Sequence, residues 1–362
     1  MKIFLNGYWN ANLGDDLFLK VLSDYFNKDY FNIIINRNNS FTYKKIPRIN
    51  LIYFKNNLIN KISNRLKKYF YLQLTESFEG QKLFWAKKND YIIDLGGSVF
   101  QLPKKGMDSQ FFNRKRFARG KIPYSIMGSN FGPFYHDYQL KKYSNIFSYS
   151  ELIFFREKKS INLFRELRNI YYTPDIVFAL NVKPYRKYNK YILFSIIQPR
   201  SKVYKDIYTK WIVNHIRKYV KQKEEIMLMA FCEPEGDLQY CKYIYRILTK
   251  EEKAFVKIKV HTDIEESLKY IANAKSIIAT RYHAMILGWI FNKPLFVLSY
   301  SDKITNVIND IAPIQNYVKL EELSEDTQIV YSKFDSKYFD NVKNEVKNNL
   351  CLLEKKIHSH EK

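Results

Sequence analysis

Cysteine is scarce in this chain, and its few thiols have neither metal-ligand nor disulfide spacing. Cys232, Cys241 and Cys351 are the three cysteines among 362 residues, and no two of them form a CxxC pair. An odd count with these spacings is typical of ordinary core thiols in a reducing compartment. DxD and HExxH motifs and Cys/His clusters are also missing, so we expect no metal site and no cofactor.

Signals for membrane insertion and for secretion are missing as well. No apolar run reaches the roughly 18 residues that a membrane span needs. The apolar start at residues 1–5 meets Asn6-Gly7 too early to be a signal peptide. We therefore expect a cytoplasmic protein.

Several active-site signatures are absent, and acidic residues are few. No GK[ST] follows a glycine loop, and neither GxGxxG nor GxSxG occurs, which argues against a P-loop and against a serine hydrolase. The chain contains 60 Lys and Arg residues but only 36 Asp and Glu residues, so the formal net charge is +24. Such a charge favours nucleic acid, anionic lipid surfaces or phosphorylated small molecules as partners. No nucleic-acid-binding motif is recognisable, so we expect no nucleic-acid partner.

The chain is rich in apolar residues, and its predicted strands and helices fall into two similar series. Hydrophobic residues make up 46% of the sequence, which is enough for substantial cores. Short apolar strands alternate with loops and helices in the pattern of a doubly wound α/β fold. The polar run 181–190 separates the two series. We therefore predict α/β domains over residues 1–183 and 184–330, and a C-terminal helix within 331–362 that packs across a domain.

The stretch that most resembles a ligand-binding site runs from Ala279 to Trp289. Residues 276–279 read as a buried strand, and residues 284–291 read as an apolar helix. This order places Arg281 and His283 at the carboxyl end of a strand and beside a helix N-terminus, where open α/β sheets bind ligands and anions. We interpret the pair as a candidate anion site. The alternative for His283 is a purely structural histidine whose ring is hydrogen-bonded within the fold.

Three further loops place glycine at the end of a predicted strand. Their residues of interest are Asn12, Gly14 and Asp15 in the first loop, Gly96, Gly97 and Ser98 in the second, and Gly128 in the third. Glycine at such a point lets a ligand or a neighbouring backbone approach closely. The alternative in each case is a simple structural turn, with Asn12 or Asp15 capping the helix that follows.

Two segments interleave aromatic residues with Lys and Arg, at 54–70 and at 104–121. The first has helical apolar spacing and fits either an anionic membrane surface or a solvated surface helix. The second fits either a pyrophosphate or lipid headgroup, or a solvated loop.

Taken in order, these motifs resemble those of the polysaccharide pyruvyl transferase family over residues 5–311. Besides the loops above, the resemblance rests on Gly128 to Pro133, Arg156 with Ser160, Thr173-Pro174-Asp175, Arg281-x-His283, Pro294 and Tyr300-Ser301-Asp302-Lys303. It implies two Rossmann-like domains of the GT-B type that face a central cleft, with the acceptor on the N-terminal domain and the donor on the C-terminal domain. It also implies that pyruvate moves from phosphoenolpyruvate, a substrate and not a cofactor, onto two hydroxyls of one sugar as a cyclic ketal.

The chemistry of the donor suggests roles for several basic residues of the chain. Phosphoenolpyruvate carries a phosphate and a carboxylate, which guanidinium and ammonium groups can pair through charge-assisted hydrogen bonds. We expect Arg281 to bind the donor, helped by Lys303 and by Arg156 or Arg200. A structural ion pair is the alternative for Arg156 and Asp175.

Ketal formation also needs a proton at the methylene carbon and the removal of a proton from an attacking hydroxyl. His283 exchanges protons near neutral pH and is our candidate general acid. Asp15 is our candidate for orienting or deprotonating the acceptor hydroxyl.

The resemblance implies a sugar acceptor, carried on a lipid-linked oligosaccharide. Segments 54–70 and 104–121 would then serve a peripheral contact with an anionic membrane surface at the inner face of the plasma membrane. A GT-B glycosyltransferase with a nucleotide-sugar donor is the alternative, since it would share the fold and the charge.

Overall fold

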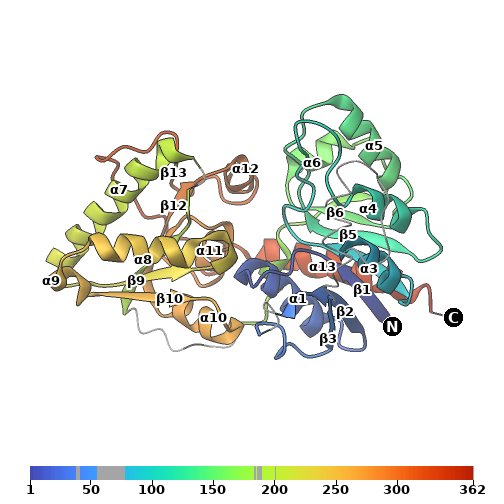
Figure 1. Cartoon of the computed structure of the whole chain (residues 1–362), viewed down its shortest axis with the longest axis horizontal. Helices are drawn as coiled ribbons and strands as arrows, with labels where there is room; N and C mark the ends of the chain where they lie inside the picture. The colour runs from blue at the N-terminus through green and yellow to red at the C-terminus, as the bar shows by residue number, and fades with distance from the viewer. Residues whose placement is uncertain (38–40, 55–77, 183–184, 186–189, 200, 362) are drawn as a thin grey trace, which may run out of the picture. The chain divides into compact units, whose positions relative to one another are not determined.

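The computed structural model describes residues 1–37, 41–54, 78–182, 185, 190–199 and 201–361, which form two compact units (Figure 1). Unit 1 comprises Met1–Trp9, Phe18–Ala179 and Asn344–Lys362, and unit 2 comprises Asn10–Leu17 and Leu180–Lys343. Each unit is built on one parallel sheet, so the predicted two-domain α/β architecture is confirmed. The units differ from the predicted ranges because residues 10–17 group with unit 2 and residues 344–362 group with unit 1.

Unit 1 holds a seven-stranded sheet in the order β3-β2-β1-β4-β5-β6-β7, in which all neighbours are parallel. Its strands are β1 (Lys2–Asn6), β2 (Tyr30–Ile35), β3 (Ile49–Tyr53), β4 (Tyr91–Leu95), β5 (Tyr124–Ser129), β6 (Ile153–Phe155) and β7 (Ile170–Tyr172). β4 and β5 are buried along their whole length. This is expected of parallel strands that are covered on both faces.

The helical elements around this sheet are α1 (Leu13–Tyr25), α3 (Phe78–Ala86), α4 (Phe111–Ala118), α5 (Asp137–Phe147), α6 (Lys158–Leu163), the 3-10 turn η2 (Ile176–Ala179) and α13 (Asp340–His358). The boundary between the units falls inside α1, after Leu17. The predicted helix within 54–70 lies outside the described residues, apart from its first residue.

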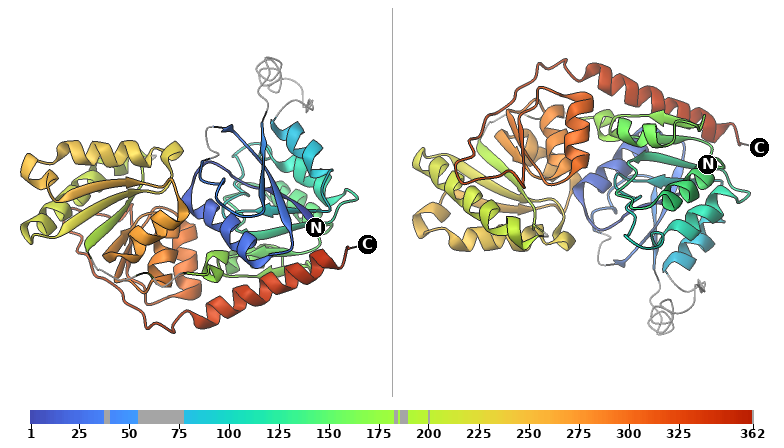
Figure 2. Two further views of the ribbon diagram at one scale, coloured as in Figure 1. Left: turned by 90° about the horizontal axis from the view of Figure 1, so that it is seen from below. Right: turned by 90° about the horizontal axis from the view of Figure 1, so that it is seen from above.

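Most of the C-terminal helix α13 belongs to unit 1, where it packs along one side of the unit (Figure 2). Its apolar stripe of Val346, Leu350, Leu353 and Ile357 is fully buried. The side chain of Asn349 donates a hydrogen bond to the carbonyl of Tyr172, at 3.0 Å. The helix therefore packs across a domain, as its apolar spacing predicts.

Unit 2 holds a six-stranded sheet in the order β10-β9-β8-β11-β12-β13, again with all neighbours parallel. Its strands are β8 (Tyr191–Ile196), β9 (Glu225–Ala230), β10 (Val256–Val260), β11 (Ala274–Ala279), β12 (Leu295–Ser299) and β13 (Tyr317–Lys319). The strand order reverses between β8 and β11. In open α/β sheets, ligands bind outside the carboxyl ends of the strands at such a reversal.

The helical elements of unit 2 are α7 (Lys202–Lys221), the 3-10 turn η3 (Glu233–Glu235), α8 (Asp237–Ile247), α9 (Lys250–Lys253), α10 (Ile264–Ala272), α11 (Tyr282–Ile290) and α12 (Asp302–Ile311). α11 is buried from Ala284 to Trp289, which explains why it is apolar on every side. Its N-terminus therefore emerges from the core at a fixed point, directly after β11.

Candidate active site

The first group of site residues lies where β11 passes into α11. The Ser195 hydroxyl, near the end of the neighbouring strand β8, accepts a hydrogen bond from the backbone N–H of Arg281 at 2.8 Å. The Thr280 hydroxyl is 3.1 Å from the Tyr208 hydroxyl, and both groups are buried. These contacts fix the backbone that presents Arg281 and His283 at the strand reversal.

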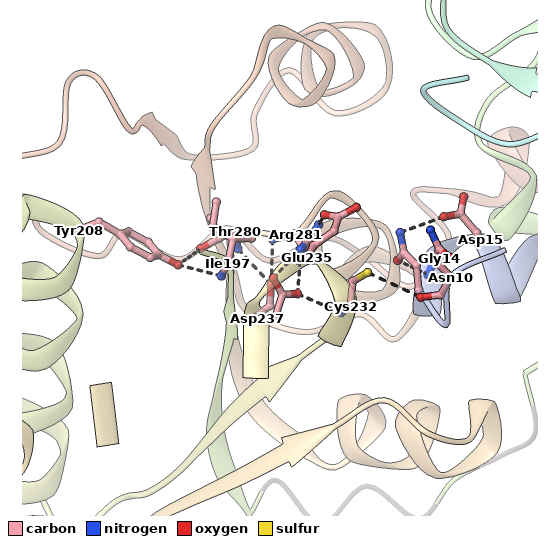
Figure 3. A network of polar contacts seen from close by, with 12 residues as sticks. Asn10, Gly14, Asp15, Ile197, Tyr208, Cys232, Glu235, Asp237, Thr280 and Arg281 are labelled. Carbon is pink, nitrogen blue, oxygen red and sulfur yellow. Dashed lines mark hydrogen bonds and ion pairs between the residues drawn. The ribbon is translucent and has the colours of Figure 1, made fainter. Parts of the chain in front are cut away.

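The guanidinium group of Arg281 is held by two carboxylates (Figure 3). Its Nε donates to Asp237 Oδ2 at 2.8 Å, its Nη2 also contacts Asp237, and its Nη1 lies 2.5 Å from Glu235 Oε2. Asp237 is fully buried, and burial raises the pKa of its carboxyl group while the Arg281 charge opposes that rise. Arg281 was predicted as a cation for the donor, and the structure gives it two anionic partners that the sequence did not reveal.

Glu235 and Asp237 lie at a glycine-containing turn after a strand, like the other candidate site residues. They follow β9 and flank Gly236, which has a left-handed backbone with φ of 89°. A polar, glycine-containing loop at a strand end was the signal that could have identified them. Nearby, burial and the charge of Glu235 raise the pKa of Cys232 to about 12, so this thiol stays protonated as an ordinary core thiol.

Residues 10–17 form the second side of the site, and they group with unit 2. The N–H of Leu13 donates to the carbonyl of Phe231 at 3.1 Å, and Asn12 pairs with Cys232 as an antiparallel bridge. Within the segment, the Asn12 amide donates to Asp15 Oδ2 at 2.9 Å. The predicted loop residues Asn12, Gly14 and Asp15 therefore belong to the same unit as Arg281 and His283.

Gly14 lies directly against the imidazole of His283. A Cβ atom added to Gly14 would be 1.8 Å from His283 Nδ1 and 2.3 Å from Cε1. The sequence predicts that a ligand or a neighbouring backbone approaches this glycine closely, whereas the group that lies against it in the structure is the His283 side chain. The candidate general acid is thus placed beside the residue that precedes Asp15.

Lys303 and two tyrosines complete the described site on the α12 side. The ammonium group of Lys303 is 5.3 Å from the ring centre of Tyr300 and 5.9 Å from that of Tyr282. Burial alone would raise the pKa of Tyr300, but the charges of Lys303 and Arg281 and a hydrogen bond from Lys303 lower it below its ordinary value. The shifted pKa of Tyr300 could not be predicted from local sequence, because Arg281 and Tyr300 meet only in the folded unit.

The other predicted loop residues come together in unit 1. A Cβ atom on Gly97 would be 2.4 Å from the guanidinium nitrogens of Arg156. Arg156 is 2% exposed, pairs with Asp175 at 2.9 Å and donates to Asn130 at 3.0 Å. Ser98 donates to the same Asn130 oxygen at 3.1 Å. Arg156 therefore forms the structural pair with Asp175 that is the alternative to donor binding, and its guanidinium packs against the glycine turn. Its help in binding the donor stays a prediction.

Gly96 and Gly128 have backbone conformations that explain their identity. Their φ angles are 140° and 74°, in the region where residues with a side chain are strained. Neither position needs a ligand to account for the glycine. Arg200, the remaining predicted donor-binding residue, lies outside the described residues.

Within the described ranges, no group of three or more His, Cys, Asp or Glu side chains is arranged to hold a metal ion. Across the same ranges, every helix is too short or too polar to cross a bilayer.

Comparison with known proteins gives a family and a fold. The sequence model of the polysaccharide pyruvyl transferase family matches residues 12–302. No curated protein has a significant sequence match to the chain.

Among solved structures, the UDP-GlcNAc 2-epimerase of Methanocaldococcus jannaschii is similar, with a TM-score of 0.58, 13% identity and coverage of 98% of this chain and 99% of that one. The UDP-N-acetylglucosamine 2-epimerase of Rickettsia bellii has a TM-score of 0.52, 11% identity and coverage of 99% and 97%. Anabaena HepE, solved with UDP and glucose, has a TM-score of 0.52, 11% identity and coverage of 96% and 94%. At these identities the likeness shows the GT-B type of fold.

Proposed function

The chain belongs to the polysaccharide pyruvyl transferase family, and from this premise we propose that it moves pyruvate from phosphoenolpyruvate onto one sugar of a bacterial surface polysaccharide or of its lipid-linked precursor. The product is a cyclic ketal, and phosphate is released. The observation that carries the proposal is the contact of the His283 ring with Gly14, the residue before Asp15, in the same unit as Arg281 and Lys303.

The proposed reaction has two bond-forming steps. In the first, one sugar hydroxyl attacks C2 of phosphoenolpyruvate while a proton adds to the methylene carbon, which becomes a methyl group. In the second, the other hydroxyl bonds to C2 as the bond from C2 to the phosphate oxygen breaks, and its proton leaves with phosphate or solvent. Atoms balance without an oxidant or a reductant.

His283 is the proposed source of the methylene proton, since imidazole exchanges protons near neutral pH. Asp15 is the proposed acceptor of the proton from the first hydroxyl. The Asn12 amide bonded to one of its oxygens orients this carboxylate. Both residues lie at the carboxyl side of the unit 2 sheet, where a ligand is expected.

Arg281 and Lys303 are the proposed anion-binding groups. Guanidinium has five N–H donors, and the contacts with Asp237 and Glu235 use three of them. The two remaining donors can reach a phosphate or carboxylate oxygen, and the carboxylates keep the group rigid while they offset its charge. Lys303 adds a cation whose only described aromatic neighbours are Tyr282 and Tyr300.

The test is release of phosphate from phosphoenolpyruvate in the presence of galactose, glucose and N-acetylmannosamine glycosides, both aryl and lipid-linked. We expect acceptor-dependent release and a product heavier by a pyruvyl ketal, and we expect His283→Ala and Arg281→Lys to abolish both. Lys303→Met should weaken donor binding, whereas the control Lys210→Met, which removes an exposed cation paired with Glu325, should not. Transfer from a nucleotide sugar with no phosphate release from phosphoenolpyruvate would replace this function with that of a glycosyltransferase.

A further inference from the structure

A buried chain of three polar side chains lies behind the site and takes no part in the proposed chemistry. Asp16 Oδ2 is 2.9 Å from His261 Nε2, and His261 Nδ1 is 2.8 Å from Ser267 Oγ. The side chains of Asp16 and His261 are both 0% exposed. Asp16 belongs to the first turn of α1, His261 follows β10, and Ser267 lies in α10. All three belong to unit 2.

The chemistry of the three groups fixes the direction of one hydrogen bond. An ionised carboxylate only accepts, so His261 Nε2 must carry a proton and donate it to Asp16. The Ser267 hydroxyl can donate or accept, so it satisfies Nδ1 whether the ring is neutral or charged. The other carboxylate oxygen of Asp16, Oδ1, has no hydrogen-bond partner among the described residues. The buried carboxylate therefore depends on His261 for its compensation.

His261 is itself held by the fold. Its backbone N–H donates to the carbonyl of Ala230 at 2.9 Å, which extends the β9 and β10 pairing by one residue. Its ring is fixed from the far side by Ser267. The imidazole thus provides a rigid donor at a defined point for the first turn of α1.

The position of Asp16 in that turn makes the contact relevant to the site. Asp16 N–H donates to the Asn12 carbonyl at 3.0 Å, so the turn is helical. Successive residues in a helix point about 100° apart, because a turn contains about 3.6 residues. Anchoring Asp16 in the interior therefore sets the direction of Asp15, which is half-buried, and the approach of Gly14 to the His283 ring.

We infer that His261 is a positioning residue that acts through Asp16, with Ser267 behind it, to hold residues 12–16 in register with His283. The catalytic consequence of this inference rests on the proposed function. The geometric consequence, which is the placement of Gly14 against His283, does not.

The geometric part is tested first, on the full-length protein without substrate. Hydrogen exchange of the peptide that covers residues 10–17 and the imidazole NMR signal of His283, assigned by its loss in His283→Gln, are compared in wild type, His261→Leu and His261→Gln. We expect faster exchange and a shifted His283 signal in His261→Leu. We expect recovery of both in His261→Gln, because the Gln amide can donate to Asp16.

The matched control is His215→Gln. His215 is a buried histidine of the same unit, bonded to the carbonyl of Trp211 at 2.9 Å and in contact with no residue of 10–17 among its described hydrogen bonds. This variant should leave both readouts as in wild type. If His261→Leu does not fold, Ser267→Ala is the substitute, with changes in the same direction but smaller. Wild-type exchange and an unshifted His283 signal in a folded His261→Leu or Ser267→Ala protein would overturn the inference.

The catalytic part is then measured as phosphate release. His261→Leu should lower kcat by up to about 100-fold, the cost of roughly one ångström of misplacement, while KM for phosphoenolpyruvate stays unchanged and His261→Gln restores kcat. A fall in stability with an unchanged kcat would assign the three residues a purely structural role. Absence of phosphate release in wild type, with the exchange and NMR changes present, would refute the proposed function and leave the positioning inference standing.

Discussion

At the scale of single residues, glycines in this protein make room for the protein's own charged or titratable side chains. Gly14 admits the His283 ring and Gly97 admits the Arg156 guanidinium. Glycine after a strand is usually interpreted as space for a ligand. Here each of these two positions has a specific side chain in that space, which can be tested by filling it.

Gly14→Ala should damage the site more than it damages the fold. The added methyl would overlap the His283 ring, and overpacking of this kind costs about 1–3 kcal/mol, whereas Ala in a helix gains about 1 kcal/mol over Gly. We therefore expect a small net loss in the free energy of unfolding and a fall in kcat that approaches 100-fold as His283 is displaced. Urea unfolding and phosphate release measure the two effects.

Gly106→Ala is the control for this substitution. No atom lies within 4 Å of its added Cβ, but its φ of 81° carries a left-handed strain that costs about 1–2 kcal/mol. It should lower stability at least as much as Gly14→Ala and leave kcat unchanged. Wild-type kcat in Gly14→Ala would show that the contact with His283 has no catalytic importance.

Tyr300 should ionise at a lower pH than the other shifted tyrosines. Lys303 and Arg281 lower its pKa against the effect of burial, whereas burial raises the pKa of Tyr91, Tyr124 and Tyr208. A folded-state pKa below the unfolded value of about 10 means that Tyr300 adds stability above that value and loses this contribution as the pH falls through the folded pKa. In a pH titration of the wild type, phenolate absorbance should therefore show an early phase, which begins at a lower pH than the ionisation of the other shifted tyrosines.

The early phase should disappear in Tyr300→Phe and move to higher pH in Lys303→Met. Lys210→Met removes an exposed cation elsewhere in unit 2 and should leave it in place. An early phase that survives in Tyr300→Phe would assign it to another tyrosine.

The partners of Arg281 show where prediction for single residues ends. The strand before Arg281 and the helix after it could be predicted from local apolar patterns. Its ion pair with Asp237 could not, because the two residues are 44 positions apart and meet only when β9 and β11 share a sheet. The same is true of Asp16 and His261, which are separated by 245 positions.

At the scale of elements, α13 shows how much local pattern can predict. Its apolar residues Val346, Leu350, Leu353 and Ile357 are buried, because three- and four-residue spacing places them on one face. Phe339 continues the same spacing in the sequence, but it precedes the helix, and its ring centre lies 5.3 Å from that of Trp289 in unit 2. The spacing predicted the helix, and only tertiary contacts determined where the stripe ends.

Neighbouring leucines of α13 should therefore differ sharply in their effect on stability. Leu353 is 0% exposed, so Leu353→Ala should cost about 2–5 kcal/mol in the free energy of unfolding. Leu352 is 37% exposed, and Leu352→Ala should change stability by no more than about 0.5 kcal/mol. Urea unfolding of both variants measures the difference, and equal losses would mean that the helix does not pack as described.

At the scale of the whole molecule, the excess of basic residues should accelerate capture of an anionic donor. The net charge of +24 raises the local concentration of anions. Salt shortens the screening length from about 10 Å at 0.1 M to about 3 Å at 1 M. We expect kcat/KM for phosphoenolpyruvate to fall with added salt.

The control for this prediction is the KM for an uncharged aryl glycoside acceptor, which should not follow the same trend. A kcat/KM for phosphoenolpyruvate that is flat in salt would mean that the net charge does not steer the donor. The excess would then have to serve another anionic partner.

The chain order of the two units has a consequence for synthesis on the ribosome. Residues 10–17 complete unit 2, yet they are made more than 200 residues before their partners Cys232, His261 and His283. Unit 1 is completed by α13, which is made after the strands of unit 2. N-terminal domains commonly fold while translation continues, but here neither unit has all of its segments until late in elongation. We expect fragments cut at the boundary near Ala179 to be poor substitutes for the intact polypeptide, because each would carry a segment that belongs to the other.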